Sequence, residues 1–130
     1  MSMLEGMMRE MASKYVKDVE SSYDITNAKR DSEDLLKLAT AYDAAVDYEE
    51  NDLIEWKPGL RDPGNKFPAY GQPVLCYELS DVREPSQREP GMAIDYKDLT
   101  IAMKHTDVDS ILFFPADSRR FRKYRPPQEQ

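Results

Sequence analysis

Apolar side chains in the first fifty residues repeat with the period of an amphipathic helix. Between residues 2 and 23 they recur at steps of three and four, with charged side chains filling the other positions, which predicts a helix. The apolar stripe of this helix is Leu4, Met8, Met11, Tyr15 and Val19, continued by Tyr23. Such a stripe must be covered, so we expect it to pack on the rest of the chain, on a protein partner or across a homodimer.

A second helix is predicted from about Asn27 or Asp31 to Asp47. Its start is rich in side chains that suit a helix N-terminus, namely Asp31, Ser32, Glu33 and Asp34. Its apolar face consists of Leu35, Leu38, Ala39, Tyr42, Ala45 and Val46. Two helices joined by a short break predict either an α-hairpin or one arm that docks on the second half of the chain.

From residue 53 onward, short apolar runs separated by turn residues predict β-strands. The expected strands are 53–57, 72–79, 99–105, 111–114 and 122–124, with Val74, Cys76 and Tyr77 as core candidates and a tight or 3₁₀ turn over 117–121. One long early loop followed by tight late turns is typical of a small, partly open barrel of the SH3-like or OB-like kind. The turn before the last strand favours the SH3-like kind.

We therefore expect an α+β protein with three parts: an acidic two-helix region over 1–50, an SH3-like barrel over 51–125 and a flexible tail over 126–130. Charge follows this division. Residues 1–52 carry 13 acidic and 6 basic side chains, whereas residues 53–130 carry 12 of each, so the whole net charge of −7 lies before residue 53. The densest basic run is 119–125, near the other end of the chain.

Several classes of function find no support in the sequence. The single cysteine, Cys76, excludes an internal disulfide and a multi-cysteine zinc site, and it fits a reducing cytoplasm. No signal peptide and no membrane-spanning run is present. A lone histidine, His105, offers no catalytic triad, and Asp107, Asp109 and Asp117 suit turns better than a metal. We expect neither catalysis nor a cofactor.

Three spaced motifs carry a resemblance to a known group of proteins. They are the stretches 52–60 (D-L-I-E-W-K-P-G-L), 68–74 (P-A-Y-G-Q-P-V) and 117–121 (D-S-R-R-F). Together they resemble a group of small uncharacterised bacterial proteins that are often found on phages, plasmids and integrative elements. The resemblance covers roughly 42–124 and implies an SH3-like barrel in a mobile-element context, but no mechanism.

The leading hypothesis is a non-enzymatic protein–protein interaction or regulatory protein of a phage or mobile element. The expected contact surface consists of Trp56, Phe67, Tyr70, Arg119 and Arg120, which place aromatic and basic side chains next to loops. One alternative is an anti-defence inhibitor, of anti-CRISPR or antirestriction type, that mimics nucleic acid and occupies a basic nucleic-acid-handling protein. Its acidic face would be Asp31, Glu33, Asp34, Asp43, Asp47, Glu49 and Glu50.

A second alternative is a small barrel that binds single-stranded nucleic acid. The run 119–125 interleaves basic side chains with Phe121 and Tyr124, and stacking combined with cationic grooves is how such barrels bind single strands. The low isoelectric point, near 4.7, opposes this alternative because most of the surface would repel a polyanion.

Overall fold

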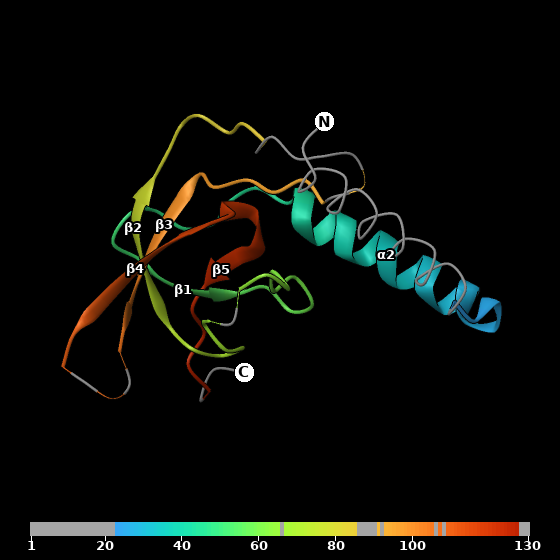
Figure 1. The fold of residues 1–130 in the computed structure, drawn as a ribbon, viewed down its shortest axis with the longest axis horizontal. Helices are drawn as coiled ribbons and strands as arrows, with labels where there is room; N and C mark the ends of the chain where they lie inside the picture. The colour runs from blue at the N-terminus through green and yellow to red at the C-terminus, as the bar shows by residue number, and fades with distance from the viewer. Residues whose placement is uncertain are drawn as a thin grey trace, which may run out of the picture.

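The computed structural model describes residues 23–65, 67–85, 91, 93–105, 107 and 109–127. The helix predicted over 2–23, with Leu4, Met8, Met11, Tyr15 and Val19, lies outside the described residues except for its last position. Within the described part, one α-helix leads into a five-stranded antiparallel open sheet, so the chain is an α+β protein (Figure 1). No helix in this part has the length and apolar character needed to cross a bilayer.

Each predicted strand is present, with ends that shift by up to two residues. The elements are η1 (Ile25–Asn27), α2 (Ala28–Asp43), β1 (Leu53–Trp56), β2 (Val74–Leu79), β3 (Leu99–Lys104), β4 (Ile111–Ala116), η2 (Ser118–Arg120) and β5 (Phe121–Lys123). The strand order is β4-β3-β2-β1-β5, and all neighbours are antiparallel. The 3₁₀ turn expected before the last strand is η2. Its cap is the Asp117 carboxylate, which accepts a hydrogen bond from the Arg119 amide.

Helix α2 ends earlier than its sequence pattern predicts. The backbone of Ala44 is extended, so the helix stops at Asp43 rather than at Asp47. The following segment instead brings Tyr48 into the core, where its ring is buried and its hydroxyl donates to the carbonyl of Ser118. The gain from burying a tyrosine with a satisfied hydroxyl exceeds that of one more helical turn in solvent. The predicted helical positions of Ala45 and Val46 are therefore wrong.

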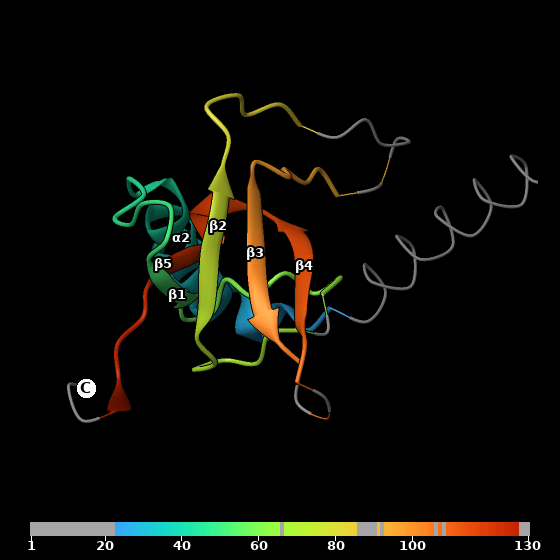
Figure 2. The same ribbon diagram turned by 90° about the vertical axis from the view of Figure 1, so that its left-hand side faces the viewer.

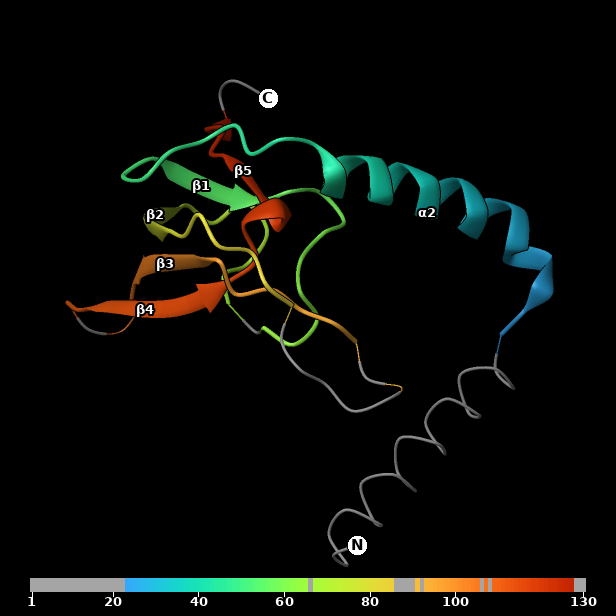
Figure 3. The same ribbon diagram turned by 90° about the horizontal axis from the view of Figure 1, so that it is seen from above.

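Helix α2 is an arm that touches the sheet domain near one end. None of its residues is buried, and Leu35 and Leu36 are exposed. Figures 1 and 3 show the helix leading away from the strands, with its C-terminal end nearest to them. There the Lys57 ammonium donates to the carbonyl of Ala41 over 2.6 Å.

The turn before the first long loop is shaped for this contact. Gly59 has a φ of +76°, which favours glycine, and a Cβ at this position would lie 2.7 Å from the Cδ2 atom of Leu38. The turn therefore lets the helix approach closely. The predicted α-hairpin remains a prediction, because its first helix lies outside the described residues.

The core lies on one face of the sheet. Its largest fully buried side chains are Trp56, Phe121, Ile54, Leu99, Ile101, Val74 and Cys76. The rings of Trp56 and Phe121 stack with centroids 4.2 Å apart, and the indole N–H donates to the carbonyl of Pro68 over 2.7 Å. The core positions predicted for Val74 and Cys76 are confirmed.

The core position predicted for Tyr77 is wrong. The pairing of β2 with β3 shifts register between Cys76 and Glu78, which marks a β-bulge at Tyr77. Successive side chains of a strand point to opposite faces, so Tyr77 lies on the face opposite its buried neighbour Cys76, with 51% of its surface exposed. Strands β2, β3 and β4 lie side by side in Figure 2, and β4 is the last strand on that side of the sheet.

Candidate interaction site

A cluster of charged side chains joins α2, the β2–β3 loop and η2. The Arg83 guanidinium lies 2.8 Å from the Asp117 carboxylate and 3.2 Å from that of Asp98, and it also donates to the hydroxyl of Tyr42. The Tyr42 hydroxyl in turn donates to Asp117 over 2.7 Å. The guanidinium also stacks on the ring of Tyr96, 3.9 Å from its centroid. Segments far apart in sequence are thereby held together.

The electrostatics of this cluster are those of a structural ion pair. Burial and the hydrogen bond to Asp117 raise the pKa of Tyr42 to about 12, so its hydroxyl stays protonated as a donor. Burial by itself would lower the pKa of Arg83, but the hydrogen bond and charge of Asp117 raise it overall. Each charged group is matched by partners inside the cluster, which leaves no group poised for proton transfer to a substrate.

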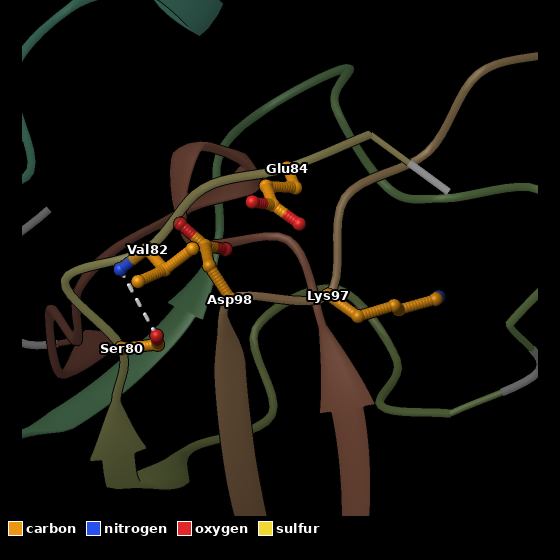
Figure 4. A pocket seen from close by; sticks show the side chains of 5 residues that line it. All are labelled: Ser80, Val82, Glu84, Lys97 and Asp98. Carbon is orange, nitrogen blue, oxygen red and sulfur yellow. Dashed lines mark hydrogen bonds between the residues drawn. The ribbon is translucent and has the colours of Figure 1, made fainter. Parts of the chain in front are cut away.

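A pocket of about 280 Å³ adjoins this cluster, lined by Ser80, Val82, Glu84, Lys97 and Asp98. Figure 4 shows the carboxylates of Glu84 and Asp98 near each other, whereas the Lys97 amine points away. Asp98 accepts hydrogen bonds from both the amide and the hydroxyl of Ser118, at 2.8 and 2.6 Å. Both oxygens of Asp98 are therefore engaged in contacts that hold the start of η2.

The remaining candidates for a chemical role are a metal-binding cluster, the thiol of Cys76 and the imidazole of His105. Among the described residues, no group of three or more His, Cys, Asp or Glu side chains is arranged to hold a metal ion. Burial raises the pKa of the Cys76 thiol to about 11, so at neutral pH it is a protonated core side chain. The Nδ1 atom of His105 accepts a hydrogen bond from the Asp107 amide over 3.1 Å, within the β3–β4 turn.

The contact surface predicted around Trp56 needs correction. Trp56 is 1% exposed because its ring completes the core, so its side chain cannot reach a partner. Phe67 and Tyr70 are exposed, as expected. Arg120 donates to the carbonyl of Leu60 over 3.1 Å and lies 3.6 Å from Asp117. The structure thus leaves two of the aromatic side chains on the surface and draws Arg120 into internal contacts.

The remaining arginines of the basic run also have internal partners. Arg119 lies 3.7 Å from Asp43 of α2, and Arg122 lies 3.6 Å from the buried carboxylate of Glu55. Phe121 is fully buried and stacks on Trp56, so it offers no stacking face to a base. These contacts argue against a cationic, aromatic groove for single strands, which needs exposed rings and unpaired cations.

Several residues of the predicted acidic face have partners within the chain. Asp31 pairs with Arg30, Asp43 lies near Arg119, Asp47 accepts from the amide of Lys123, and Glu50 accepts from that of Leu79. Helix α2 itself carries four acidic and three basic side chains, a net of −1. Glu33, Asp34 and Glu49 are exposed. A nucleic-acid mimic needs closely spaced, unpaired carboxylates, and this arrangement supplies few of them.

One face of the sheet carries partly exposed apolar side chains that the sequence analysis did not predict as a surface. Leu53, Leu75, Ala102 and Phe113 are cross-strand partners in succession and so form one row over β1, β2, β3 and β4. We call this row, together with Tyr77 and Ile111, the outer sheet face. The rings of Tyr77 and Phe113 touch at 4.8 Å between centroids. Tyr77, Leu53, Ile111 and Phe113 are each about half exposed.

A hollow lies at the β3–β4 end of this face. Its volume is about 520 Å³, and its lining includes Leu75, Ala102, Lys104 and Ile111. Ala102 is buried at the centre of the row, where its short side chain leaves room between its larger neighbours. Exposed apolar patches of this kind occur at protein, membrane and ligand contact sites, so we take this face as a candidate contact surface.

The outer sheet face continues to the strand edge at β4, which pairs only with β3 in the described part of the chain. Its six pairs with β3 run from Leu99–Ala116 to Lys104–Ile111 without a bulge, and the strand carries no charged residue. A regular, uncharged edge lacks the usual devices that prevent strand addition. Pro115 is the one such device, and it lies near the end of the strand. The apolar run I-L-F-F over 111–114 was the available sequence signal for this edge.

Comparison with protein-family models, with curated protein sequences and with solved structures finds no significant match for this chain.

Proposed function

We propose that this chain is a non-enzymatic protein–protein interaction protein of a phage or other mobile element, and that it works in the cytoplasm. Its scaffold is an SH3-like barrel. The strand order β4-β3-β2-β1-β5, the long β1–β2 loop and the 3₁₀ turn between β4 and β5 support this assignment. The three sequence motifs resembling mobile-element proteins support the biological context.

The contact site is the β4 edge with the adjoining outer sheet face, and its occupant is an extended strand of a protein. The observation that carries this proposal is the regular, uncharged and apolar β4 at the end of the sheet. Strand addition satisfies the outward backbone groups of such an edge, and side chains on alternate positions supply specificity. Ile111 and Phe113 lie at alternate positions on the outer face and provide these contacts.

The contacts that polar side chains make with one another inside the chain also support binding rather than catalysis. Arg83 forms ion pairs with both Asp98 and Asp117, and it also donates to the hydroxyl of Tyr42 on α2. The polar side chains that sequence reasoning could assign to chemistry or to nucleic acid thus serve the fold. Among the described residues, the outer sheet face is an exposed apolar surface, and the centres of protein interfaces are enriched in apolar side chains.

Site-specific photocrosslinking tests the proposal with a matched control. A benzophenone amino acid replaces Phe113 in one variant and Tyr70 in another; the two aromatic side chains are 49% and 51% exposed. Cells that naturally express the protein are irradiated, and the crosslinked products are identified by mass spectrometry. We expect a specific protein adduct at position 113 that is at least about tenfold more abundant than at position 70. Adducts at position 70 alone, or at neither position, would overturn the assignment of the site.

A further inference from the structure

We propose that the strand bound at the β4 edge is β4 of a second copy of this chain, so that two sheets join into one across a two-fold axis. This inference rests on the proposed function, because it names the occupant of the same site. The pairing of β4 with β3 determines the direction in which each backbone group of β4 points.

The hairpin between β3 and β4 sets the phase of the ladder. The His105 amide donates to the carbonyl of Ser110 over 2.9 Å, so these two residues form a hydrogen-bonded pair. In an antiparallel ladder, hydrogen-bonded and non-hydrogen-bonded pairs alternate. Leu112, Phe114 and Ala116 therefore direct their backbone groups toward β3.

The remaining positions of β4 direct theirs away from the sheet. These are Ile111, Phe113 and Pro115, and the proline fits this phase because it has no N–H to offer β3. Among the described residues, no hydrogen bond from the backbone of Ile111 or Phe113 to another element is present. The edge thus offers two complete donor–acceptor sets and one carbonyl.

This pattern is self-complementary in one register. When two β4 strands run antiparallel with Leu112 at the two-fold axis, Ile111 of each copy pairs with Phe113 of the other. Both pairs exchange N–H and C=O groups in full. A register centred on Phe113 would instead pair Ile111 with Pro115, which lacks a donor. Pro115 therefore selects the register centred on Leu112.

The side chains fit the same register. On the outer sheet face, Ile111 of one copy lies beside Phe113 of the other, and on the core face the two copies of Leu112 are adjacent. All three side chains are exposed in the single chain. The strand carries no charge, so pairing brings no like charges together along it even though each chain carries a net −7. The two outer sheet faces become one continuous apolar surface.

The first test is the mass in solution, measured by sedimentation at chain concentrations from about 1 to about 300 μM. This range is chosen because a contact made by one pair of short strands is small and predicts micromolar or weaker affinity. Wild-type chain should pass from monomer to dimer over this range. Phe113→Lys places a charge at the edge and should weaken association by at least about tenfold. Leu53→Lys is the matched control, because Leu53 lies on the same face with similar exposure but on β1, three strands away from β4.

The control separates two modes of association. Loss of the dimer with Phe113→Lys alone supports edge pairing. Equal loss with both variants would show packing of one outer sheet face on another and would overturn the inference. A wild-type chain that stays monomeric over the whole range would overturn it as well.

Disulfide trapping tests the register independently. Across the proposed axis, two copies of position 112 form a non-hydrogen-bonded pair with Cα atoms about 4.5 Å apart, which suits a disulfide. Leu112→Cys should therefore oxidise to a covalent dimer, whereas Phe113→Cys should do so at least about tenfold more slowly, because position 113 faces position 111. The native thiol of Cys76 is buried and takes no part. Equal rates for both variants would overturn the register.

Failure of this inference and failure of the proposed function give different results. A monomeric chain whose position 113 crosslinks to another protein overturns the dimer and leaves the proposed function standing. Absence of any adduct at position 113, including one with the chain itself, overturns both.

Discussion

Arg83 and Asp117 form a 2.8 Å ion pair between the β2–β3 loop and the residue that caps η2. The carboxylate of Asp117 is 3% exposed and also accepts hydrogen bonds from the Tyr42 hydroxyl and the Arg119 amide. One buried side chain thus connects the helical arm, a loop and the last turn of the sheet. Because a buried charge that loses its partner is strongly destabilising, this pair should matter more to folding than any surface pair.

The substitution Asp117→Asn should lower the free energy of unfolding by about 2–4 kcal/mol. It leaves the guanidinium of Arg83 with a weaker partner and removes the negative charge of the residue that caps η2. Chemical denaturation followed by circular dichroism measures the change. Asp43→Asn is the control: its carboxylate is 74% exposed and lies 3.7 Å from Arg119, so the expected change is within about 0.5 kcal/mol. Equal effects of the two substitutions would contradict a structural role for the cluster.

Stability should fall in alkaline solution in a way that depends on Tyr42. Its pKa is about 12 in the folded chain and near 10 in the unfolded chain. The folded state therefore holds the proton more tightly, and the resulting stability is complete below pH 10 and is lost as the pH rises toward 12. Asp117, Arg83 and Arg120 are the charged groups that face the hydroxyl.

Comparison with Tyr42→Phe isolates this contribution. The phenylalanine variant should be less stable at pH 8 by about 1 kcal/mol because the hydrogen bond to Asp117 is lost. The gap between wild type and variant should then narrow between pH 10 and 12, by about 1 kcal/mol or less because solvent screens a partly exposed group. Urea unfolding at each pH measures both values. A gap that stays constant over this interval would show that Tyr42 ionises equally in the two states.

The thiol of Cys76 should be unreactive while the chain is folded. It is fully buried, and burial raises its pKa to about 11. At pH 8, labelling by a disulfide reagent should be at least about 100-fold slower than in denaturant, since it requires opening of the core. The variant Ser80→Cys adds an exposed thiol as an internal standard, and one of its two thiols should react at once. Rapid reaction of both would contradict the burial of Cys76.

Trp56 should contribute stability rather than contacts. Trp56→Ala should lower the free energy of unfolding by about 3–5 kcal/mol, because it removes a buried ring that stacks on Phe121. Tyr70→Ala, at an exposed ring whose hydroxyl accepts from the Arg61 amide, should cost about 1 kcal/mol. Thermal unfolding of the two variants measures the difference. Loss of partner binding in Trp56→Ala would report unfolding, so Phe113 is the better position for interaction assays.

Local chemistry made much of this fold predictable from sequence. The alternation of apolar and polar side chains predicted the strands. The Asp117 carboxylate before Ser118 predicted the capped 3₁₀ turn, because such caps form between residues that are close in sequence. The boundary near residue 52, where helical periodicity gives way to alternation, was visible for the same reason. The apolar setting of Cys76 likewise predicted a buried thiol.

Contacts between distant segments decided the rest. Tyr48 enters the core just beyond the end of α2, the burial of Cys76 leaves its neighbour Tyr77 on the opposite face, and Phe121 packs over Trp56. Each outcome depends on which strands become neighbours, and local patterns do not encode that choice. The same holds for the β4 edge. The sequence determined an apolar strand over 111–114, but only the strand order shows that, in the described part of the chain, this strand pairs with β3 alone, which leaves its outward backbone groups available for pairing.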